Sequence, residues 1–261
     1  MTRLAFRLSY IGTRFFGSQI QADCRTVEGA VITACRELGL FSDWREARFA
    51  PAGRTDRGVH ARGQVFAIST DQPERAVSTI NLLLPRDCWC TGWAEVDEDF
   101  HPRYDAITRT YRYYFPDPEL DISAMQKGAD AFQGRHDFSR FSRPSDRDPV
   151  RTIFSASILR EDSFTVFEVC GKSFLWNMVR CMACILREIG NGEREPQDIT
   201  ELLKNPEGRR ISAAPPGNLI LWDVDCETEF TPLPMDKRSL LYTADLKKEL
   251  CTQKKMIDLI S

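Results

Sequence analysis

The sequence predicts an α+β fold in which two units share one continuous, mostly antiparallel sheet. Segments with alternating apolar residues, typical of strands, are interspersed with segments that carry apolar residues at helical spacing. No internal repeat or low-complexity linker divides the chain, and its 261 residues, 42% of them hydrophobic, suffice for a large core. We place the boundary near residue 105, which gives an N-terminal unit of residues 1–105 and a C-terminal unit of residues 106–261.

The N-terminal unit is expected to begin with a strand over residues 4–8, where apolar and other residues alternate. A helix over residues 27–38 follows, because its apolar residues recur at helical spacing, Thr26 can serve as N-cap and Gly39 can end the helix. The remaining predicted elements are a strand at 64–69, a short helix at 75–83 and a strand at 89–96.

The C-terminal unit is expected to begin with a strand over residues 108–115, which is rich in Thr and Tyr. Alternation puts Arg109, Tyr111, Tyr113 and Phe115 on one face of that strand. The other predicted elements are a helix at 122–132, a hairpin of strands at 152–159 and 164–170, a helix at 176–189, a strand at 219–224 and a helical tail after Pro234.

Charge is segregated along the chain rather than spread evenly. The net charge of −3 argues against a uniformly basic nucleic-acid binder, so any RNA site must come from a local concentration of charge. Arginine outnumbers lysine 27 to 8, and residues 48–64 hold four arginines against one acid. Guanidinium groups suit bidentate phosphate contact and stacking on bases, so this clustering favours RNA over solvated surface salt bridges.

Neither a targeting segment nor a metal site is expected. The N-terminal apolar stretch is interrupted by Arg7, and the apolar run at 175–189 is broken by Arg180 and Arg187, which predicts a cytoplasmic protein without a membrane span. Of nine cysteines only Cys181 and Cys184 have CxxC spacing, and the three histidines show no ligand spacing. We expect these two cysteines to be packing residues on a helix.

The most informative segment runs from Ala52 to Ala61 and reads Ala-Gly-Arg-Thr-Asp-Arg-Gly-Val-His-Ala. It places the carboxylate of Asp56 between Arg54 and Arg57 in a glycine-rich turn, where the carboxylate can be exposed and immobilised. The alternative is an ordinary surface turn, because Asp two residues before Gly is common turn chemistry.

This spacing resembles the signature of the tRNA pseudouridine synthase A family, and the resemblance extends from about residue 4 to about residue 224. Ser18 stands where bacterial members usually carry Trp, so the chain looks closer to archaeal or eukaryotic relatives. The other segments that match the family, in order, are Tyr10–Thr13, Phe16–Gln19, Thr26–Glu28, Asn81–Asp87, Phe100–Arg103, Arg109–Tyr113, Gly134–Phe138, Phe174–Arg180 and Ala213–Gly217.

The resemblance implies two ferredoxin-like (RRM-like) halves with a central basic cleft between them. It also implies a homodimer that isomerises uridine to pseudouridine in the anticodon stem-loop of tRNA, with positions 38 to 40 as the expected targets. The reaction breaks the bond between N1 and C1′, turns the base and rejoins it through C5. Because no atom is added or lost, no cofactor is required.

Four residues are expected to form the site, and the resemblance implies that Arg180 pairs with Asp56. Asp56 is the expected catalytic nucleophile, and Arg180 is its expected partner because a nearby cation favours the ionised carboxylate. Tyr111 can stack its ring on an extruded uracil, and its hydroxyl can assist removal of the C5 proton. Arg54 is placed to occupy the space that a flipped base leaves or to grip the adjacent phosphate. His136 and Asp137 are expected to hold the local fold.

Two other functions remain open from the sequence. One is an RNA-binding or RNA-folding factor that uses the same cleft without catalysis, although a pure binder has no need of a carboxylate beside phosphates. The other is a metal-dependent nuclease with Asp56 as a ligand, which lacks the second and third carboxylates expected for a divalent ion.

Overall fold

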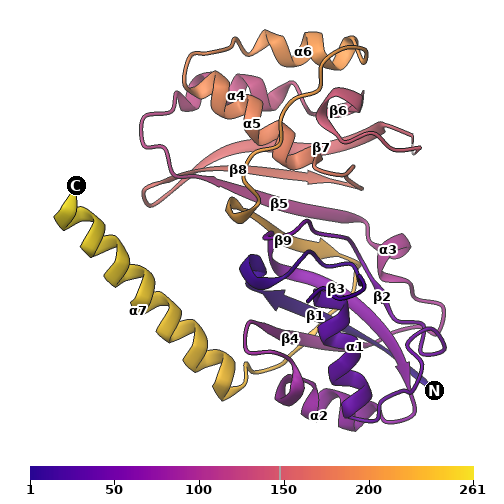
Figure 1. Ribbon diagram of the computed structural model, residues 1–261. Helices are drawn as coiled ribbons and strands as arrows, with labels where there is room; N and C mark the ends of the chain where they lie inside the picture. The colour runs from indigo at the N-terminus through magenta and orange to yellow at the C-terminus, as the bar shows by residue number, and fades with distance from the viewer. Residues whose placement is uncertain (147) are drawn as a thin grey trace.

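The protein forms one large mixed sheet with helices packed against it (Figure 1). The structure is a computed structural model that describes residues 1–146 and 148–261. Its strands are β1 (Thr2–Tyr10), β2 (Ala50–Pro51), β3 (His60–Thr70), β4 (Cys88–Glu95), β5 (Thr108–Phe115), β6 (Gly134–Asp137), β7 (Val150–Glu161), β8 (Phe164–Gly171), β9 (Leu219–Asp225) and β10 (Thr231–Pro232). Its helices are α1 (Val27–Glu37), α2 (Pro73–Leu83), α3 (Pro102–Asp105), α4 (Ile122–Asp130), α5 (Met178–Gly190), α6 (Gln197–Lys204) and α7 (Lys237–Ile260).

The sheet runs continuously through both parts of the chain, in the order β10-β4-β1-β3-β9-β5-β8-β7-β6, and β2 pairs with β3 beside this path. Among the described strands every pairing is antiparallel except that of β3 with β9. The predicted α+β class and the single continuous sheet are therefore confirmed.

The N-terminal elements form where the apolar pattern predicts them. Thr26 caps α1, because its Oγ1 accepts a hydrogen bond from the Gly29 amide at 3.2 Å. β3 begins at His60, four residues before the predicted start at residue 64. The reason is long-range pairing, since His60 and Ala61 lie beside β9, a contact that local periodicity does not report.

The two faces of β5 have different environments, as the alternation predicts. Arg109, Tyr111, Tyr113 and Phe115 are buried, on the face against which α5 packs. The alternating residues on the other face are only partly buried. β5 thus carries Tyr111 into the interior between the sheet and α5.

α5 begins at Met178 rather than at the predicted Trp176. Asn177 has a φ of 65°, in the left-handed region, so it cannot belong to the right-handed helix that follows. Met178 and Met182 are buried, and Cys181, 3% exposed, is a packing residue of the core as expected. On the other face, Arg180 and Cys184 are half-buried and Arg187 is exposed.

β9 joins the two parts of the sheet. It comes late in the chain, yet it lies between β3, which it pairs with in parallel through two residues, and β5, which it pairs with in antiparallel fashion. The next segment returns to the N-terminal part, where β10 pairs with β4. Residues 1–105 therefore share their sheet with strands from beyond residue 105.

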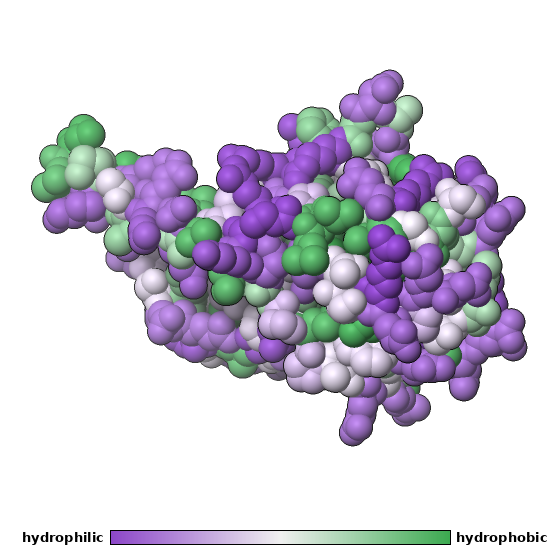
Figure 2. All heavy atoms as spheres, turned by 90° about the horizontal axis from the view of Figure 1, so that it is seen from below, coloured by the Kyte–Doolittle hydropathy of each residue, from purple (hydrophilic) through white to green (hydrophobic). Residues whose placement is uncertain are grey.

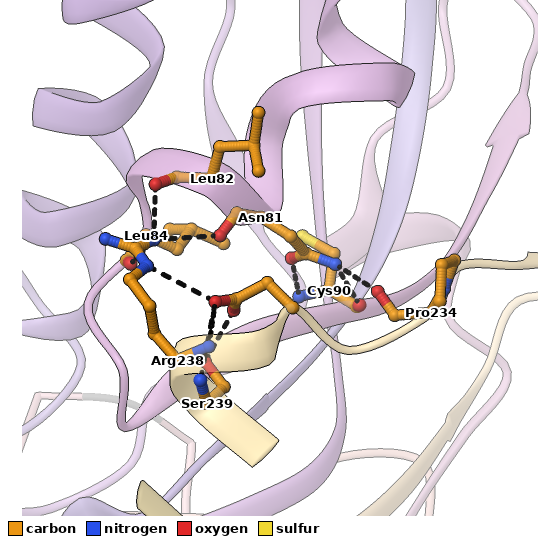
Figure 3. A network of polar contacts seen from close by, with 8 residues as sticks. Asn81, Leu82, Leu84, Cys90, Pro234, Arg238 and Ser239 are labelled. Atoms are coloured by element: carbon orange, nitrogen blue, oxygen red, sulfur yellow. Dashed lines mark hydrogen bonds and ion pairs between the residues drawn. The ribbon is translucent and has the colours of Figure 1, made fainter. Parts of the chain in front are cut away.

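α7 is anchored at its first turn and then extends away from the body (Figure 1). The Arg238 guanidinium donates to the carbonyl oxygens of Asn81, Leu82 and Leu84 at the end of α2, and the Asn81 side chain also holds Pro234 (Figure 3). The helix forms the arm at the left of Figure 2, whose tip is apolar. Of the helices in the described ranges, none combines the length and apolar character needed to cross a membrane.

Candidate active site

The turn that carries Asp56 connects β2 to β3 and is fixed through its neighbour Thr55. The Thr55 amide donates to Ser18 Oγ at 2.9 Å, and the Ser18 amide donates back to the Thr55 carbonyl at 3.0 Å. Thr55 Oγ1 also shares a hydrogen bond of 2.8 Å with the hydroxyl of buried Tyr10. Since Thr55 is held on three sides, the Asp56 backbone is positioned while its side chain stays 24% exposed.

A second fastening of this turn comes from His60, whose role the sequence reasoning missed. The Gly12 amide donates to His60 Nδ1 at 3.1 Å, and His60 Nε2 lies 3.1 Å from the Gly217 carbonyl. Burial lowers the pKa of His60, although the contact with the Gly217 carbonyl acts in the opposite direction. A neutral ring with its proton on Nε2 satisfies both contacts, so His60 joins three segments of the chain. The sequence feature that could have indicated this role is the position of His60 in the same motif as Asp56, four residues further along the chain.

Arg180 reaches Asp56 from the first turn of α5. Its Nη1 lies 2.9 Å from Asp56 Oδ2 and 3.0 Å from Asn177 Oδ1, and its Nε donates to the Ala214 carbonyl at 2.7 Å. The side chains of Arg180 and Asp56 are 15% and 24% exposed. Asn177 and Ala214 therefore orient the guanidinium, and the structure brings together two residues that are 124 positions apart.

Tyr111 lies in the interior beside this ion pair. It is 8% exposed, and its ring meets the ring of Phe174 edge to face, with 5.1 Å between centroids. Burial raises the pKa of Tyr111 to about 12; Arg109 opposes the rise and the charge of Asp56 adds to it. The phenol is therefore protonated at neutral pH. Its hydroxyl can accept another proton only if it donates the proton that it already carries.

Among the described residues, no hydrogen bond or ion pair joins Arg54 to Asp56 or Arg180. The Arg54 side chain is exposed and makes no hydrogen bond or ion pair with the residues that the structure describes. His136 and Asp137 serve local structure as predicted, because His136 Nε2 lies 2.7 Å from the Gln133 carbonyl and Asp137 Oδ1 accepts from the Ser139 amide at 2.7 Å.

Arg109 is a further residue that sequence reasoning missed. It is 7% exposed and donates hydrogen bonds of 2.7 to 3.3 Å to four backbone carbonyls. Burial lowers the pKa of Arg109, since the charged form is desolvated. Its acceptors belong to Ala52 in the aspartate segment, to Arg103 and Ala106 around α3, and to Lys172 after β8. Arg109 therefore holds the segments around Asp56 in fixed relation.

These side chains form a carboxylate bound to an oriented guanidinium, next to a buried phenol, where the two parts of the sheet meet. Within residues 1–146 and 148–261, no group of three His, Cys, Asp or Glu side chains is arranged to hold a metal ion. The arrangement can present one carboxylate oxygen to a ligand, position an aromatic ring and supply a protonated hydroxyl.

Comparison with known proteins shows which family the chain belongs to. Residues 129–226 match the family model described as tRNA pseudouridine synthase. The chain is 58% identical over 242 residues to tRNA pseudouridine synthase A of Methanoculleus marisnigri, which covers 93% of this chain and 89% of the relative. The corresponding protein of Methanosphaerula palustris is 52% identical over 99% of this chain and 92% of the relative, and that of Thermococcus sibiricus is 44% identical over 86% and 85%.

These matches define a pseudouridine synthase, an isomerase that acts on uridine in tRNA. The chain belongs to the tRNA pseudouridine synthase A family, and the relatives named above are archaeal, as the residue at position 18 suggested. Membership of an enzyme family favours the isomerase over the RNA-binding factor and the nuclease.

Proposed function

We propose that Asp56 is the nucleophile of a uridine-to-pseudouridine isomerisation in the anticodon stem-loop of tRNA, at positions 38 to 40. The observation that carries this proposal is the 2.9 Å contact between Arg180 and Asp56, made by elements far apart in the sequence. An oriented guanidinium favours the ionised carboxylate and leaves its second oxygen available to attack. The covalent adduct between Asp56 and the uridine splits one difficult rearrangement into two steps.

The rearrangement conserves all atoms of the uridine. The bond between N1 and C1′ breaks, the uracil turns, and a bond forms between C5 and C1′. The proton on C5 then leaves and N1 gains one, so the product is an isomer of the substrate. The nucleophile attacks either C1′ of the sugar or the base, and both routes release the free Asp56 carboxylate at the end.

Tyr111 and Arg54 complete the proposed site. The Tyr111 ring stacks on the extruded uracil, and its protonated hydroxyl relays the C5 proton. A uridine within a stem or loop must flip out of the stack to reach Asp56, at a cost of a few kcal/mol. The exposed Arg54 guanidinium, two residues before Asp56, fills the space that the base leaves or grips the adjacent phosphate.

We further propose that the chain comprises two ferredoxin-like halves, residues 1–105 with Asp56 and residues 106–261 with Tyr111 and Arg180. A basic cleft between them would receive the tRNA in a cytoplasmic homodimer, one subunit holding the body of the tRNA while the other acts. The meeting of Asp56 with Arg180 where the two parts of the sheet join supports the cleft.

The decisive experiment incubates the purified protein with an unmodified tRNA transcript in EDTA and maps pseudouridine. We expect product at positions 38 to 40 from the wild type and none from Asp56→Ala, with tRNA binding retained. Asp99→Ala is the matched control, because the Asp99 side chain is fully exposed and distant in sequence. Product from Asp56→Ala would disprove the assignment of the nucleophile.

A further inference from the structure

Two exposed aromatic side chains, each covered by an arginine, belong to the segments that hold Asp56 and Arg180. We name Phe16 with Arg57 the N-terminal platform, and Trp176 with Arg143 the C-terminal platform. In the first, the guanidinium carbon lies 4.1 Å from the ring centroid, and in the second it lies 4.7 Å away. Neither pair is used by the reaction as described above.

The N-terminal platform is built into the turn that carries Asp56. Arg57 directly follows Asp56, and Phe16 precedes Gly17, which lies so close to the turn that a Cβ there would be 3.1 Å from the Thr55 carbonyl. Phe16 remains 44% exposed, and Arg57 is exposed.

The C-terminal platform is built into the entry to α5. Trp176 directly precedes Asn177, whose Oδ1 accepts from Arg180, and the Trp176 carbonyl accepts from the Arg143 amide at 3.0 Å. Trp176 is 55% exposed, and Arg143 is exposed. Each platform is therefore attached to one member of the ion pair.

A neighbouring pair shows what a purely structural contact looks like. Arg25 covers Phe15 at 4.0 Å, but Phe15 is only 1% exposed and the guanidinium is bound to Asp87. In contrast, the arginines of both platforms have no ion pair with a carboxylate of the described residues, and their rings remain open to solvent. Exposed aromatic rings with uncompensated positive charge are suited to single-stranded RNA, since bases stack on rings and guanidinium planes while phosphates take guanidinium N–H groups.

We propose that the two platforms bind the nucleotides immediately 5′ and 3′ of the target uridine, one platform for each neighbour. The inference rests on the proposed placement of that uridine at Asp56. Flipping the uridine removes the stacking partner of both neighbours. The platforms supply replacement surfaces, so part of the cost of flipping is offset, and the arginines hold the flanking phosphates.

The test is a double-mutant cycle between protein and RNA. We compare Phe16→Leu and Trp176→Leu, which keep an apolar side chain but remove the π surface, on tRNA transcripts that carry an abasic residue immediately 5′ or 3′ of the mapped target. Each variant is expected to weaken binding of intact tRNA roughly 5- to 100-fold. On the transcript that lacks the base bound by its own platform, the variant should bind like the wild type.

Trp44 with Arg45 is the matched control, since their ring and guanidinium lie 4.5 Å apart. Trp44 lies far from the site, because the Ala47 carbonyl, three residues along the chain, accepts a hydrogen bond from the Ser69 amide in β3. Ser69 is nine residues from His60 in the same strand, which corresponds to about 30 Å at the usual rise per residue. Trp44→Leu should show no coupling to either abasic position. Arg57→Gln and Arg143→Gln should each lower the slope of log K against log salt by about 0.7, whereas Arg45→Gln should leave it unchanged.

Additive effects of each Leu variant and each abasic residue would overturn the proposal, as would equal coupling of Trp44. The cycle measures binding and needs no turnover. If Asp56→Ala remained active while the coupling was observed, the nucleophile assignment would fail and the platforms would stand. If Asp56→Ala were inactive and coupling absent, the platforms would fail alone.

Discussion

Replacing Gly12 by alanine should displace Asp56, the proposed nucleophile, without changing that residue itself. A Cβ on Gly12 would lie 2.0 Å from the Val59 carbonyl oxygen, 2.5 Å from the Val59 carbonyl carbon and 3.0 Å from that of Gly58. All three atoms are backbone of the turn that holds Asp56, so no side chain can rotate away. To restore a separation of 3.0 Å the turn must withdraw by about 1 Å.

A displacement of this size should reduce both turnover and stability. The 2.9 Å contact between Asp56 and Arg180 would lengthen or reorient, and a misplacement of about 1 Å at a reacting group can reduce the rate about 100-fold. Overpacking should lower the free energy of unfolding by about 1–3 kcal/mol. The assays are pseudouridine formation at saturating tRNA and denaturant unfolding of the same preparation.

Gly53→Ala provides the matched control. Gly53 lies in the same segment, but a Cβ there would have no atom within 4 Å. The Gly53→Ala variant should retain the kcat and the free energy of unfolding of the wild type. A Gly12→Ala enzyme with kcat within about threefold of the wild type would refute the reasoning, because the turn would then tolerate the shift without moving Asp56.

Four further predictions follow from contacts in the site. Arg180→Met should unfold at nearly the wild-type denaturant concentration but lose at least about 100-fold in kcat, since it removes the partner of Asp56, as single-turnover assays would show. Burial raises the pKa of Tyr111 to about 12, so the stabilisation that its protonated form provides is complete below pH 10 and is lost between about pH 10 and 12. In the Tyr111→Phe variant, the free energy of unfolding should therefore fall less steeply over that pH interval. Arg109→Met should cost about 3 kcal/mol of stability by leaving buried carbonyls without donors, a result that an unchanged urea midpoint would contradict. Ser18→Ala should lower both stability and kcat because the Thr55 amide loses its acceptor, and Ser42→Ala, at an exposed position, should change neither.

Local patterns were sufficient to predict the elements that carry the site. The alternation over residues 108–115 put Tyr111 on the same face as Tyr113 and Phe115, which is the buried face of β5, and the helix expected at 176–189 contains Arg180. The family motifs led us to expect Asp56 and Arg180 to converge, and the structure brings them into contact. Their catalytic roles stay predictions.

Long-range features could not be predicted in the same way. β9 pairs with β3 through only two residues, and β2 and β10 are two residues long, too short for any periodicity to appear. α6 does have a local signal, because Ile199, Leu202 and Leu203 recur at helical spacing and are buried. The functions of His60 and Arg109 depend on backbone carbonyls, which every residue possesses and no sequence motif marks.

The late position of β9 has a consequence for the order in which the protein becomes active during synthesis. A nascent chain that ends after α5 already contains Asp56, Tyr111 and Arg180, but it lacks the strand that lies between β3 and β5. The contact of His60 with Gly217 likewise closes a separation of 157 residues. Such distant pairings form late, so we expect a folding step in which completion of the sheet and assembly of the site coincide, and incomplete chains that are inert toward tRNA.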